Sequence, residues 1–332
     1  MLAYPLTFVE GFVIVWAMHK LRLAIVGIGH LGSKHLKVLN DLRQEVEIVA
    51  ICDLKEDSLH LLAEQYHVPF VKNYQELEGK IDCVSLCVPT TSHFEIAQFF
   101  LNHNIHTFIE KPMTSTIQEA EKLNEIAEKR KLILQIGHVE RFNSAFQSIE
   151  RFLQKPLFIE CHRLNLFPNR SLDIGVVMDL MIHDIDIILG LVKSPIEKIE
   201  AIGANVLTRL EDIANARVTF QNGCICNLTA SRVSDEVVRK IRIFQPDSYI
   251  SLDYVKQEAF IYRKHDNQIH KHALPIDKEE PLKKELKHFI ECIRENKTPI
   301  VSGKEGQEAL AIALQVTEQI LKNIDQICLS SI

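Results

Sequence analysis

The chain has 332 residues, about the length of two compact domains, with 46% hydrophobic and 25% charged residues. This composition is typical of a folded globular protein and excludes the collagen-like, disordered and low-complexity classes. The net charge of −6 provides no basic field, so we expect neither nucleic acid nor an anionic membrane surface as a partner.

Residues 1–17 are largely apolar, but no Lys or Arg precedes the apolar run and Glu10 interrupts it. A secretory signal begins with a basic segment and a membrane span needs about 20 residues, so the segment fits neither pattern. We expect a loose tail, or a start assigned too early with Met18 as the natural first residue. The alternatives are an ordered N-terminal element and a membrane anchor. We predict no stable membrane insertion.

The cysteines are scattered through apolar segments, and no two of them form a CxxC pair. A chain of this size does not need disulfides to hold its core, so we expect reduced structural thiols, no metal site and a cytoplasmic location. The eight cysteines are Cys52, Cys83, Cys87, Cys161, Cys224, Cys226, Cys292 and Cys328.

In residues 18–138, short β-branched runs alternate with helical patterns, which predicts a doubly wound Rossmann domain with parallel strands. A capping box at Ser115 and Gln118 is expected to begin one of the helices. The expected strands are 21–27, 46–53, 81–90, 106–110 and 132–138, and another helix is expected from Ser92 to about Asn102.

The first predicted strand runs into a GxGxxG turn made by Gly27, Gly29 and Gly32. Gly27 permits the tight turn, Gly29 lets a pyrophosphate approach the backbone, and Gly32 allows close packing of the helix on the strand. Asp53 ends the second strand 21 residues after Gly32, where its carboxylate can bind the adenosine ribose hydroxyls. The sequence therefore predicts a dinucleotide site.

The residues around Asp53 favour NAD over NADP as the cofactor. A carboxylate at this position repels a 2′-phosphate, and no Arg follows it directly, although Lys55 stands two residues on. We therefore expect NAD to bind.

Glu110, Lys111 and Pro112 follow one another at the carboxyl edge of the predicted sheet, where open α/β folds bind ligands. The Lys111 ammonium can polarise a substrate oxygen there, and a surface-loop lysine is the alternative. Pro112 restricts Lys111 to extended backbone and permits a cis bond. The direction of the Lys111 side chain is therefore more restricted than that of most loop lysines.

A GHxxRF stretch follows at His138, Arg141 and Phe142. With the glycine turn and Glu-Lys-Pro, it makes the chain similar to the Gfo/Idh/MocA family over about residues 21–323. The resemblance implies an NAD(P)-binding Rossmann domain, a C-terminal α/β domain with an open, largely antiparallel sheet, and redox chemistry on a sugar or cyclitol carbon. The cofactor contacts expected from it are Gly27, Gly29, His30, Leu31, Gly32, Asp53, Val88, Pro89, Thr90, His93, Glu110 and Lys111.

Residues 139–332 are expected to form the second domain, which would bind substrate and build a homodimer or homotetramer. Asp179 and His183 resemble the family's DxxxH helix and share a helix face, which Asp186 extends. An imidazole oriented by a carboxylate is a credible general base, whereas a core histidine is the alternative. The predicted catalytic residues are Lys111, Asp179 and His183.

The rest of the second domain predicts antiparallel strands separated by turns, of which Asn222-Gly223 is the strongest hairpin signal. Two amphipathic helices close the chain, and they are expected to pack back on the first domain. Their apolar faces carry Leu286, Phe289, Ile290 and Ile293 in one helix, and Leu310, Leu314, Thr317 and Leu321 in the other.

Within the family, three stretches, residues 163–189, 211–232 and 239–254, resemble a bacterial subgroup of nucleotide-sugar dehydrogenases in lipid A precursor synthesis. The resemblance implies UDP-N-acetylglucosamine as the substrate, oxidised at C3. Arg163 and Arg170 precede the catalytic helix, and guanidinium groups suit a pyrophosphate, although solvated loop charges are the alternative. The expected substrate contacts are His138, Arg141, Arg163, Arg170, Asp179 and His183.

Two other functions remain open at this point. A free-sugar or inositol dehydrogenase would need no pyrophosphate clamp. A non-catalytic NAD-binding sensor would keep the cofactor site and lose the catalytic residues, so the presence of Lys111, Asp179 and His183 argues against it.

Overall fold

The computed structural model describes residues 8–9, 12–13, 20–167, 174–266 and 268–330. The first of these form two short strands, β1 (Phe8–Val9) and β2 (Phe12–Val13), which pair with each other in a segment where we expected no strand. In the described ranges, no helix combines the length and the apolar character needed to cross a membrane.

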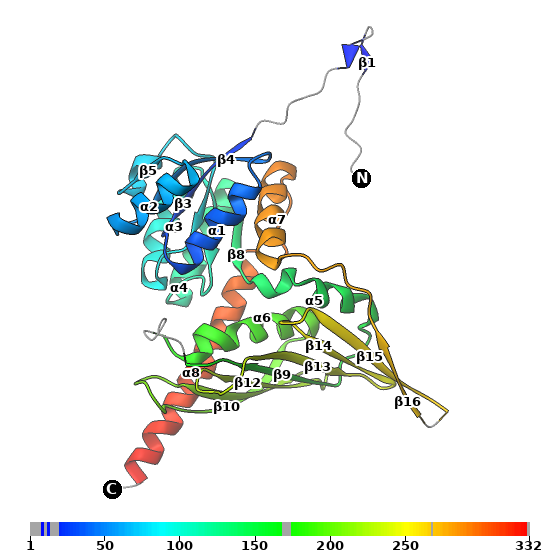
Figure 1. The fold of residues 1–332 in the computed structure, drawn as a ribbon. Helices are drawn as coiled ribbons and strands as arrows, with labels where there is room; N and C mark the ends of the chain where they lie inside the picture. Colours follow the sequence, from blue (N-terminus) through cyan, green and yellow to red (C-terminus); the bar gives the residue numbers. More distant parts are fainter. Residues whose placement is uncertain (1–7, 10–11, 14–19, 168–173, 267, 331–332) are drawn as a thin grey trace.

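The first domain contains a six-stranded parallel sheet with the order β5-β4-β3-β6-β7-β8, as the alternating pattern predicts (Figure 1). Its helices lie on both faces, so the sheet is doubly wound. The strands are β3 (Leu21–Val26), β4 (Val46–Cys52), β5 (Phe70–Val71), β6 (Cys83–Leu86), β7 (His106–Glu110) and β8 (Leu134–Gly137). The helices are α1 (His30–Asp41), α2 (Glu56–Tyr66), α3 (His93–Asn102) and α4 (Ile117–Arg130).

Two local predictions for this domain were wrong. Strand β6 covers only Cys83–Leu86 of the expected 81–90. The chain leaves the sheet after Leu86 and then forms a short 3₁₀ turn at Thr90–Ser92. The capping box of α4 lies one residue later than expected, at Thr116 and Glu119. Thr116 N–H donates to Oε2 of Glu119 at 3.0 Å, and Glu119 N–H donates to Oγ1 of Thr116 at 3.3 Å.

The second sheet has eight strands in the order β10-β11-β12-β9-β13-β14-β15-β16. Only β12 and β9 pair in parallel, so the sheet is largely antiparallel, as the resemblance implied. Its strands are β9 (Phe158–Leu164), β10 (Ile196–Ala204), β11 (Ile213–Phe220), β12 (Ile225–Ser231), β13 (Val238–Phe244), β14 (Ser248–Asp253), β15 (Glu258–His265) and β16 (Gln268–Ala273).

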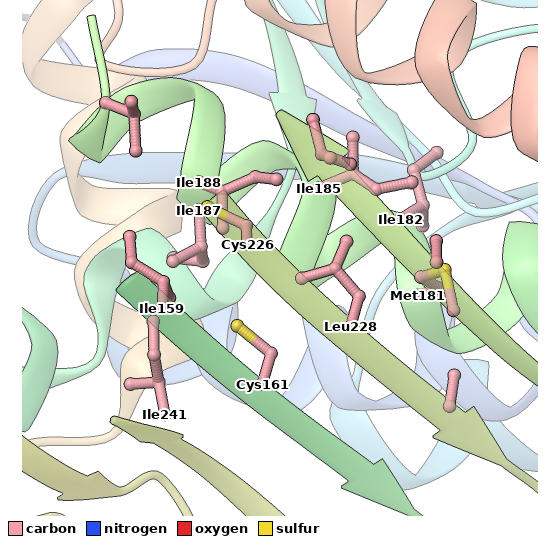
Figure 2. Close-up of a cluster of buried hydrophobic side chains, with 14 of the residues drawn as sticks. Ile159, Cys161, Met181, Ile182, Ile185, Ile187, Ile188, Cys226, Leu228 and Ile241 are labelled. Atoms are coloured by element: carbon pink, nitrogen blue, oxygen red, sulfur yellow. The ribbon is translucent and has the colours of Figure 1, made fainter. Parts of the chain in front are cut away.

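One face of this sheet is covered by α5 (Ser144–Ile149), by the helix that begins with a π-helical turn at Val177–Met181 and continues as α6 (Ile182–Leu191), and by α8 (Gly303–Ser330). Figure 2 shows how the apolar side chains of α6 meet those of the sheet. Ile182, Ile185 and Ile188 of α6 are fully buried in one apolar cluster with Ile159, Cys161 and Leu228 of the sheet. This packing fixes the distance between α6 and the sheet, and therefore the position of the π-helical turn that precedes α6.

Helix α7 (Pro281–Glu295) returns to the first domain, where its Leu286, Phe289 and Ile290 join the core beside α1. The ring of Phe289 packs edge-on against Phe108 of β7 with centroids 5.8 Å apart. Helix α8 packs against α4 and β8 at its start and then against α6 and β10. The last two helices therefore connect the two domains.

Candidate active site

The glycine turn has the backbone geometry that a bound dinucleotide requires. Gly27 has a φ of +89°, and a Cβ on it would lie 2.6 Å from the carbonyl carbon of Cys87. A Cβ on Gly32 would lie 1.8 Å from the Gly27 oxygen, whereas one on Gly29 would meet no described heavy atom within 4 Å. The space beside Gly29 is therefore open to a ligand, and helix α1 begins there without a side-chain cap among the described residues.

These features fit a dinucleotide with its phosphates at the start of α1, where backbone N–H groups and the helix dipole favour an anion. His30 and Leu31 form the first turn of that helix. Asp53 follows β4, and its carboxylate accepts hydrogen bonds from Ile28 N–H at 2.6 Å and Lys55 N–H at 2.9 Å. The Asp53 carboxylate thus stabilises the glycine turn, and it lies on the side of the turn where the ribose is expected.

Val88, Pro89 and Thr90 lie in the loop after β6, at the carboxyl edge of the sheet. His93 is buried behind this loop, and its ring nitrogens lie 2.8 Å from the Pro112 oxygen and 2.9 Å from the Val88 oxygen. The prediction that the His93 side chain contacts the cofactor was therefore wrong, because the ring is buried and both of its nitrogens face backbone oxygens. Because both nitrogens are engaged by backbone oxygens, this residue ties the Val88 loop to the Lys111 loop.

Glu110 is buried at the end of β7 and is held by His35 of α1. Nε2 of His35 lies 2.8 Å from Oε1 of Glu110, and Nδ1 lies 2.9 Å from Oγ of Ser85. Burial alone would lower the pKa of His35, but its neighbours Cys87 and Glu110 raise this pKa well above the usual value. Lys111 N–H donates to the other Glu110 oxygen at 3.3 Å, so the pair fixes the backbone of the lysine.

The Lys111 side chain reaches across to the second domain. Its ammonium donates to Oδ1 of Asp179 at 3.0 Å and to the backbone oxygen of Asp179 at 2.5 Å. We expected Asp179 to orient His183, and this was wrong, because its carboxylate is paired with Lys111 instead. The expectation assumed α-helical spacing, whereas Asp179 lies in a π-helical turn, which changes the relative directions of side chains.

His183 follows this turn and is partly buried, with no hydrogen-bond partner for Nδ1 among the described residues. Burial lowers the pKa of His183 well below its usual value, and the charges of Lys111 and Arg163 lower it further. The ring of the buried His138 stands edge-on to it with centroids 5.9 Å apart. Burial also lowers the pKa of His138, so both imidazoles are neutral near pH 7.

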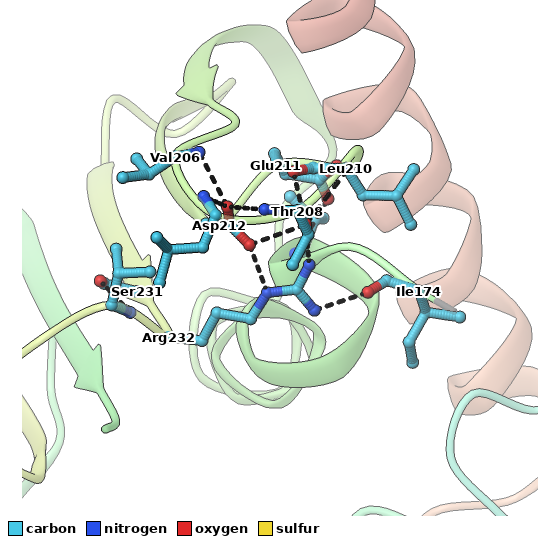
Figure 3. A network of polar contacts seen from close by, with 11 residues as sticks. Ile174, Val206, Thr208, Leu210, Glu211, Asp212, Ser231 and Arg232 are labelled. Atoms are coloured by element: carbon cyan, nitrogen blue, oxygen red, sulfur yellow. Dashed lines mark hydrogen bonds and ion pairs between the residues drawn. The ribbon is translucent and has the colours of Figure 1, made fainter. Parts of the chain in front are cut away.

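A buried network positions the start of this helix (Figure 3). Arg232 donates to Oδ1 of Asp212 at 2.8 Å and to the Ile174 oxygen at 2.7 Å. Burial would raise the pKa of Asp212, but N–H groups of Leu207 and Thr208 and the Arg232 guanidinium lower it well below its usual range. The charged pair therefore anchors the chain just before the helix that carries Asp179 and His183.

A cavity of about 570 Å³ lies between the two domains and contains these groups on its wall. Lys111 and His183 line it together with His35, Glu110 and Gly137 from the first domain. Arg239, Tyr254 and Gln257 contribute from the second sheet, and Glu280, Pro281 and Leu282 contribute from the start of α7. Its size is typical of a small-molecule site.

Two of the arginines expected to bind substrate are used inside the protein. Arg163 is 2% exposed and donates to Glu140 at 2.7 Å and to Asp184 at 2.8 and 3.0 Å. Its assignment to the substrate is therefore wrong, because the β9 side chain points into the core. Arg141 donates to Asp186 at 2.7 Å. Arg170 lies outside the described residues.

Sequence reasoning missed His35 and Arg239 as site residues. Nothing in the local sequence shows that His35 meets Glu110, which lies 75 positions away. For Arg239, by contrast, the sequence contains a sign that the side chain faces inward. It shares the strand parity of Ile241 and Ile243, which marks an inward-facing charge.

Comparisons with known proteins agree with this geometry. A family model described as the NAD-binding Rossmann fold of an oxidoreductase family, GFO_IDH_MocA, matches residues 21–138, and a model of the GFO/IDH/MocA C-terminal domain matches residues 135–245. The UDP-N-acetylglucosamine 3-dehydrogenase of Acidithiobacillus ferrooxidans is 33% identical over 306 residues, covering 90% of this chain and 97% of the relative. Its solved structure matches with a TM-score of 0.86, over 91% of this chain and 98% of that chain.

More distant relatives act on cyclitols. The myo-inositol 2-dehydrogenase of Thermotoga maritima is 24% identical, with 88% of this chain and 94% of the relative aligned. The structure of scyllo-inositol dehydrogenase from Lactobacillus casei shares the fold at 19% identity and a TM-score of 0.78, over 92% and 98% of the two chains. The chain therefore belongs to the Gfo/Idh/MocA family of oxidoreductases, which use a nicotinamide cofactor to act on CH–OH groups.

Proposed function

We propose that this protein oxidises the C3 hydroxyl of UDP-N-acetylglucosamine with NAD, giving the 3-keto sugar and NADH. The observation that carries the proposal is the meeting of Lys111, Asp179 and His183 beside the interdomain cavity, in a chain 33% identical to an enzyme with that activity. Inositol dehydrogenases are also similar, at 24% identity, and supply the rival substrate class.

The glycine turn and Asp53 support NAD as the cofactor. Gly29 leaves space for the pyrophosphate, and Asp53 presents a carboxylate where a 2′-phosphate would be repelled. When bound, the nicotinamide supplies a hydride acceptor. The remaining chemistry, which is removal of the hydroxyl proton and stabilisation of the oxygen, falls to residues of this chain.

His183 is the general base in this proposal. Its lowered pKa leaves the imidazole unprotonated at neutral pH, so a ring nitrogen can accept the hydroxyl proton as the C–H bond breaks. Lys111 stabilises the developing negative charge on the same oxygen. Asp179 holds the Lys111 ammonium at the cavity and keeps it from swinging toward solvent.

A substrate panel tests the proposal. Purified protein with NAD is mixed with UDP-N-acetylglucosamine, free N-acetylglucosamine, myo-inositol or scyllo-inositol, and NADH absorbance is followed. We expect turnover only with the UDP-sugar, with mass spectrometry showing loss of two mass units. Turnover of inositol alone would replace the proposal with a cyclitol dehydrogenase. NAD binding without turnover of any of the four would favour the non-catalytic sensor.

We also propose that the protein forms a homodimer or homotetramer through its second sheet. In the described chain, no helix covers the face opposite α6 (Figure 1). That face carries a row of aromatic rings, with Tyr249 and Tyr262 stacked 4.1 Å apart and Phe244 next to them. Light scattering after gel filtration should give a multiple of 38.1 kDa, and a monomer would contradict this part.

A further inference from the structure

His138 faces the proposed base, His183, from the first domain. The centroids of the two imidazole rings lie 5.9 Å apart, and the ring planes meet at 83°. His138 is 1% exposed and directly follows β8, whereas His183 belongs to the first turn of α6. The two rings therefore meet where the last strand of the first sheet approaches the helix that carries the base.

Three nitrogen atoms of this pair are buried without a hydrogen-bond partner in the part of the chain that the structure describes. They are Nδ1 of His183 and both ring nitrogens of His138. Because Nδ1 is buried although His183 lines the cavity, Nε2 is the nitrogen that a ligand in the cavity can reach. Buried polar groups are nearly always paired, with protein or with ordered water. A water molecule bonded to Nδ1 of His183 and to one nitrogen of His138 would meet this requirement, since no direct bond joins the two rings.

The surroundings of His183 disfavour an imidazolium. Burial lowers the pKa of His183 well below its usual value, and neighbouring positive groups lower it further. These groups are Lys111, Arg163, Arg239 and, when protonated, His138. A proton that stayed on His183 after leaving the substrate hydroxyl would be held beside these charges, so His183 is a poor final holder of that proton.

The surroundings of His138 are more favourable for a positive charge. Burial also lowers the pKa of His138, but the largest charge effect comes from the Asp186 carboxylate, which raises this pKa. Glu110 raises it as well, whereas Arg141 and Lys111 lower it. Asp186 is 1% exposed and accepts hydrogen bonds from Arg141 at 2.7 and 3.2 Å, so its carboxylate is fixed in place. Of the two rings, His138 is therefore the better holder of a proton.

We propose that His138 takes up, through one water molecule, the proton that His183 removes from the substrate hydroxyl. The inference rests on the proposed function, in which His183 is the base, and His138 acts through His183. The hydroxyl proton bonds to Nε2 of His183 while Nδ1 of the same ring gives its proton to the water, and the water gives one of its protons to His138. The hydride leaves with its electron pair in the proposed dehydrogenation itself, so the relay moves protons only. His138 returns its proton along the same water when the product leaves and solvent enters the cavity.

Steady-state kinetics of His138→Gln test the relay. The enzyme with NAD is assayed with whichever sugar or cyclitol of the substrate panel it oxidises, in H2O and in D2O. We expect kcat to fall by about 10- to 100-fold, because the proton then has no acceptor beyond His183. KM should stay within about twofold, and D2O should slow the variant more than the wild type. His106→Gln, which replaces a histidine at the amino end of β7, away from the cavity, should match the wild type in all three.

A rescue experiment separates a relay from a structural role. His138→Ala leaves space for a small ring beside His183, so added imidazole should restore part of the lost kcat. Thiazole has a ring of similar shape but is a much weaker base, so it should restore none. Equal restoration by both rings would show that His138 only fills space and would overturn the inference, as would a wild-type kcat in His138→Gln.

A pH titration of the wild type needs neither a folded variant nor a known substrate. The ring nitrogens of the enzyme with NAD, labelled with nitrogen-15 histidine, are followed by NMR from about pH 8 to about pH 5 and assigned through the backbone. We expect both rings to be neutral at pH 7 and His138 to become protonated at a higher pH than His183. The reverse order would overturn the inference, because the proton would then remain on His183. If UDP-N-acetylglucosamine is oxidised and the order is reversed, only the inference fails. If only inositol is oxidised while the His138 results hold, only the proposed function fails.

Discussion

The ammonium of Lys111 lies 3.0 Å from Oδ1 of Asp179 and 2.5 Å from the backbone oxygen of the same residue. Lys111 follows the last residue of β7 in the first domain, and Asp179 belongs to the π-helical turn of the second. The ion pair therefore spans the domain boundary at the cavity wall. The position of the proposed catalytic ammonium and the contact between the two domains therefore depend on the same pair.

The first prediction concerns this pair. Lys111→Ala should lower kcat by about 10²- to 10⁴-fold, because the developing alkoxide loses its charged partner. Asp179→Asn should lower kcat less, and the double variant should be little worse than Lys111→Ala, because both changes act on one group. Steady-state kinetics with the best substrate check this. Lys122→Ala, which removes an exposed partner of Glu125, is the control, and additive losses would contradict the coupling.

The second prediction concerns the base. His183→Gln should lower kcat by about 10²- to 10⁴-fold while leaving NAD affinity nearly intact. A base must be unprotonated to work, so the lowered pKa of His183 should keep the wild-type enzyme active below the usual histidine pKa of about 6.5. The pH profile of kcat/KM checks this. An acid limb centred at or above that value would contradict the assignment.

The third prediction concerns cofactor choice. The wild type should bind NAD more tightly than NADP, and Asp53→Ala should narrow the difference because repulsion of the 2′-phosphate is lost. Asp53→Ala also removes the acceptor of the Ile28 N–H, whereas Asp53→Asn keeps an oxygen there. Fluorescence titration of NADH and NADPH separates the two effects. Equal affinities in the unmodified protein would contradict the NAD assignment.

The fourth prediction separates structural arginines from surface ones. Arg163→Gln should destabilise the fold by about 3 to 5 kcal/mol, because Glu140 and Asp184 would remain as buried charges without their partner. Arg242→Gln breaks an exposed pair and should cost less than about 1 kcal/mol. Urea unfolding measures both. An Arg163 variant with normal stability but a raised KM would restore its original assignment to the substrate.

The fifth prediction concerns acid stability. The folded state disfavours protonation of His138 and His183, since burial lowers both pKa values. Below about pH 6.5 the unfolded chain therefore binds more protons at these two positions, and their contribution to stability is lost as pH falls. His35 acts in the opposite direction, because its pKa is raised. His138→Gln should flatten the fall in Tm between pH 7 and pH 5, and an unchanged slope would contradict it.

The parallel sheet and the glycine turn could be predicted because their determinants are local. Gly27 needs a positive φ, and apolar runs between helical patterns leave few other arrangements. The start of α4 was misplaced by one residue because two overlapping capping patterns occur there. Thr116 and Glu119 form the box, and Glu119 also accepts the Ser115 N–H at 3.1 Å.

The partners of the charged site residues could not be predicted from spacing. Asp179 and His183 are four residues apart, which indicates a shared face only if the helix is regular, and the π-helical turn breaks that assumption. Arg163 is chemically suited to a pyrophosphate, but its direction depends on a strand register that the local sequence does not determine. Its alternation with Cys161 and Ile159, both fully buried, was the available sign that it points inward.

The return of α7 to the first domain has a consequence for how the protein is made. Leu286, Phe289 and Ile290 complete an apolar layer whose other members include residues of α1, α2 and the strands β3, β4, β6 and β7. The ribosome therefore synthesises the whole second sheet before that layer can close. Ile28 of the glycine turn belongs to the same layer, so a chain truncated before α7 leaves apolar surface that chaperones and proteases can recognise.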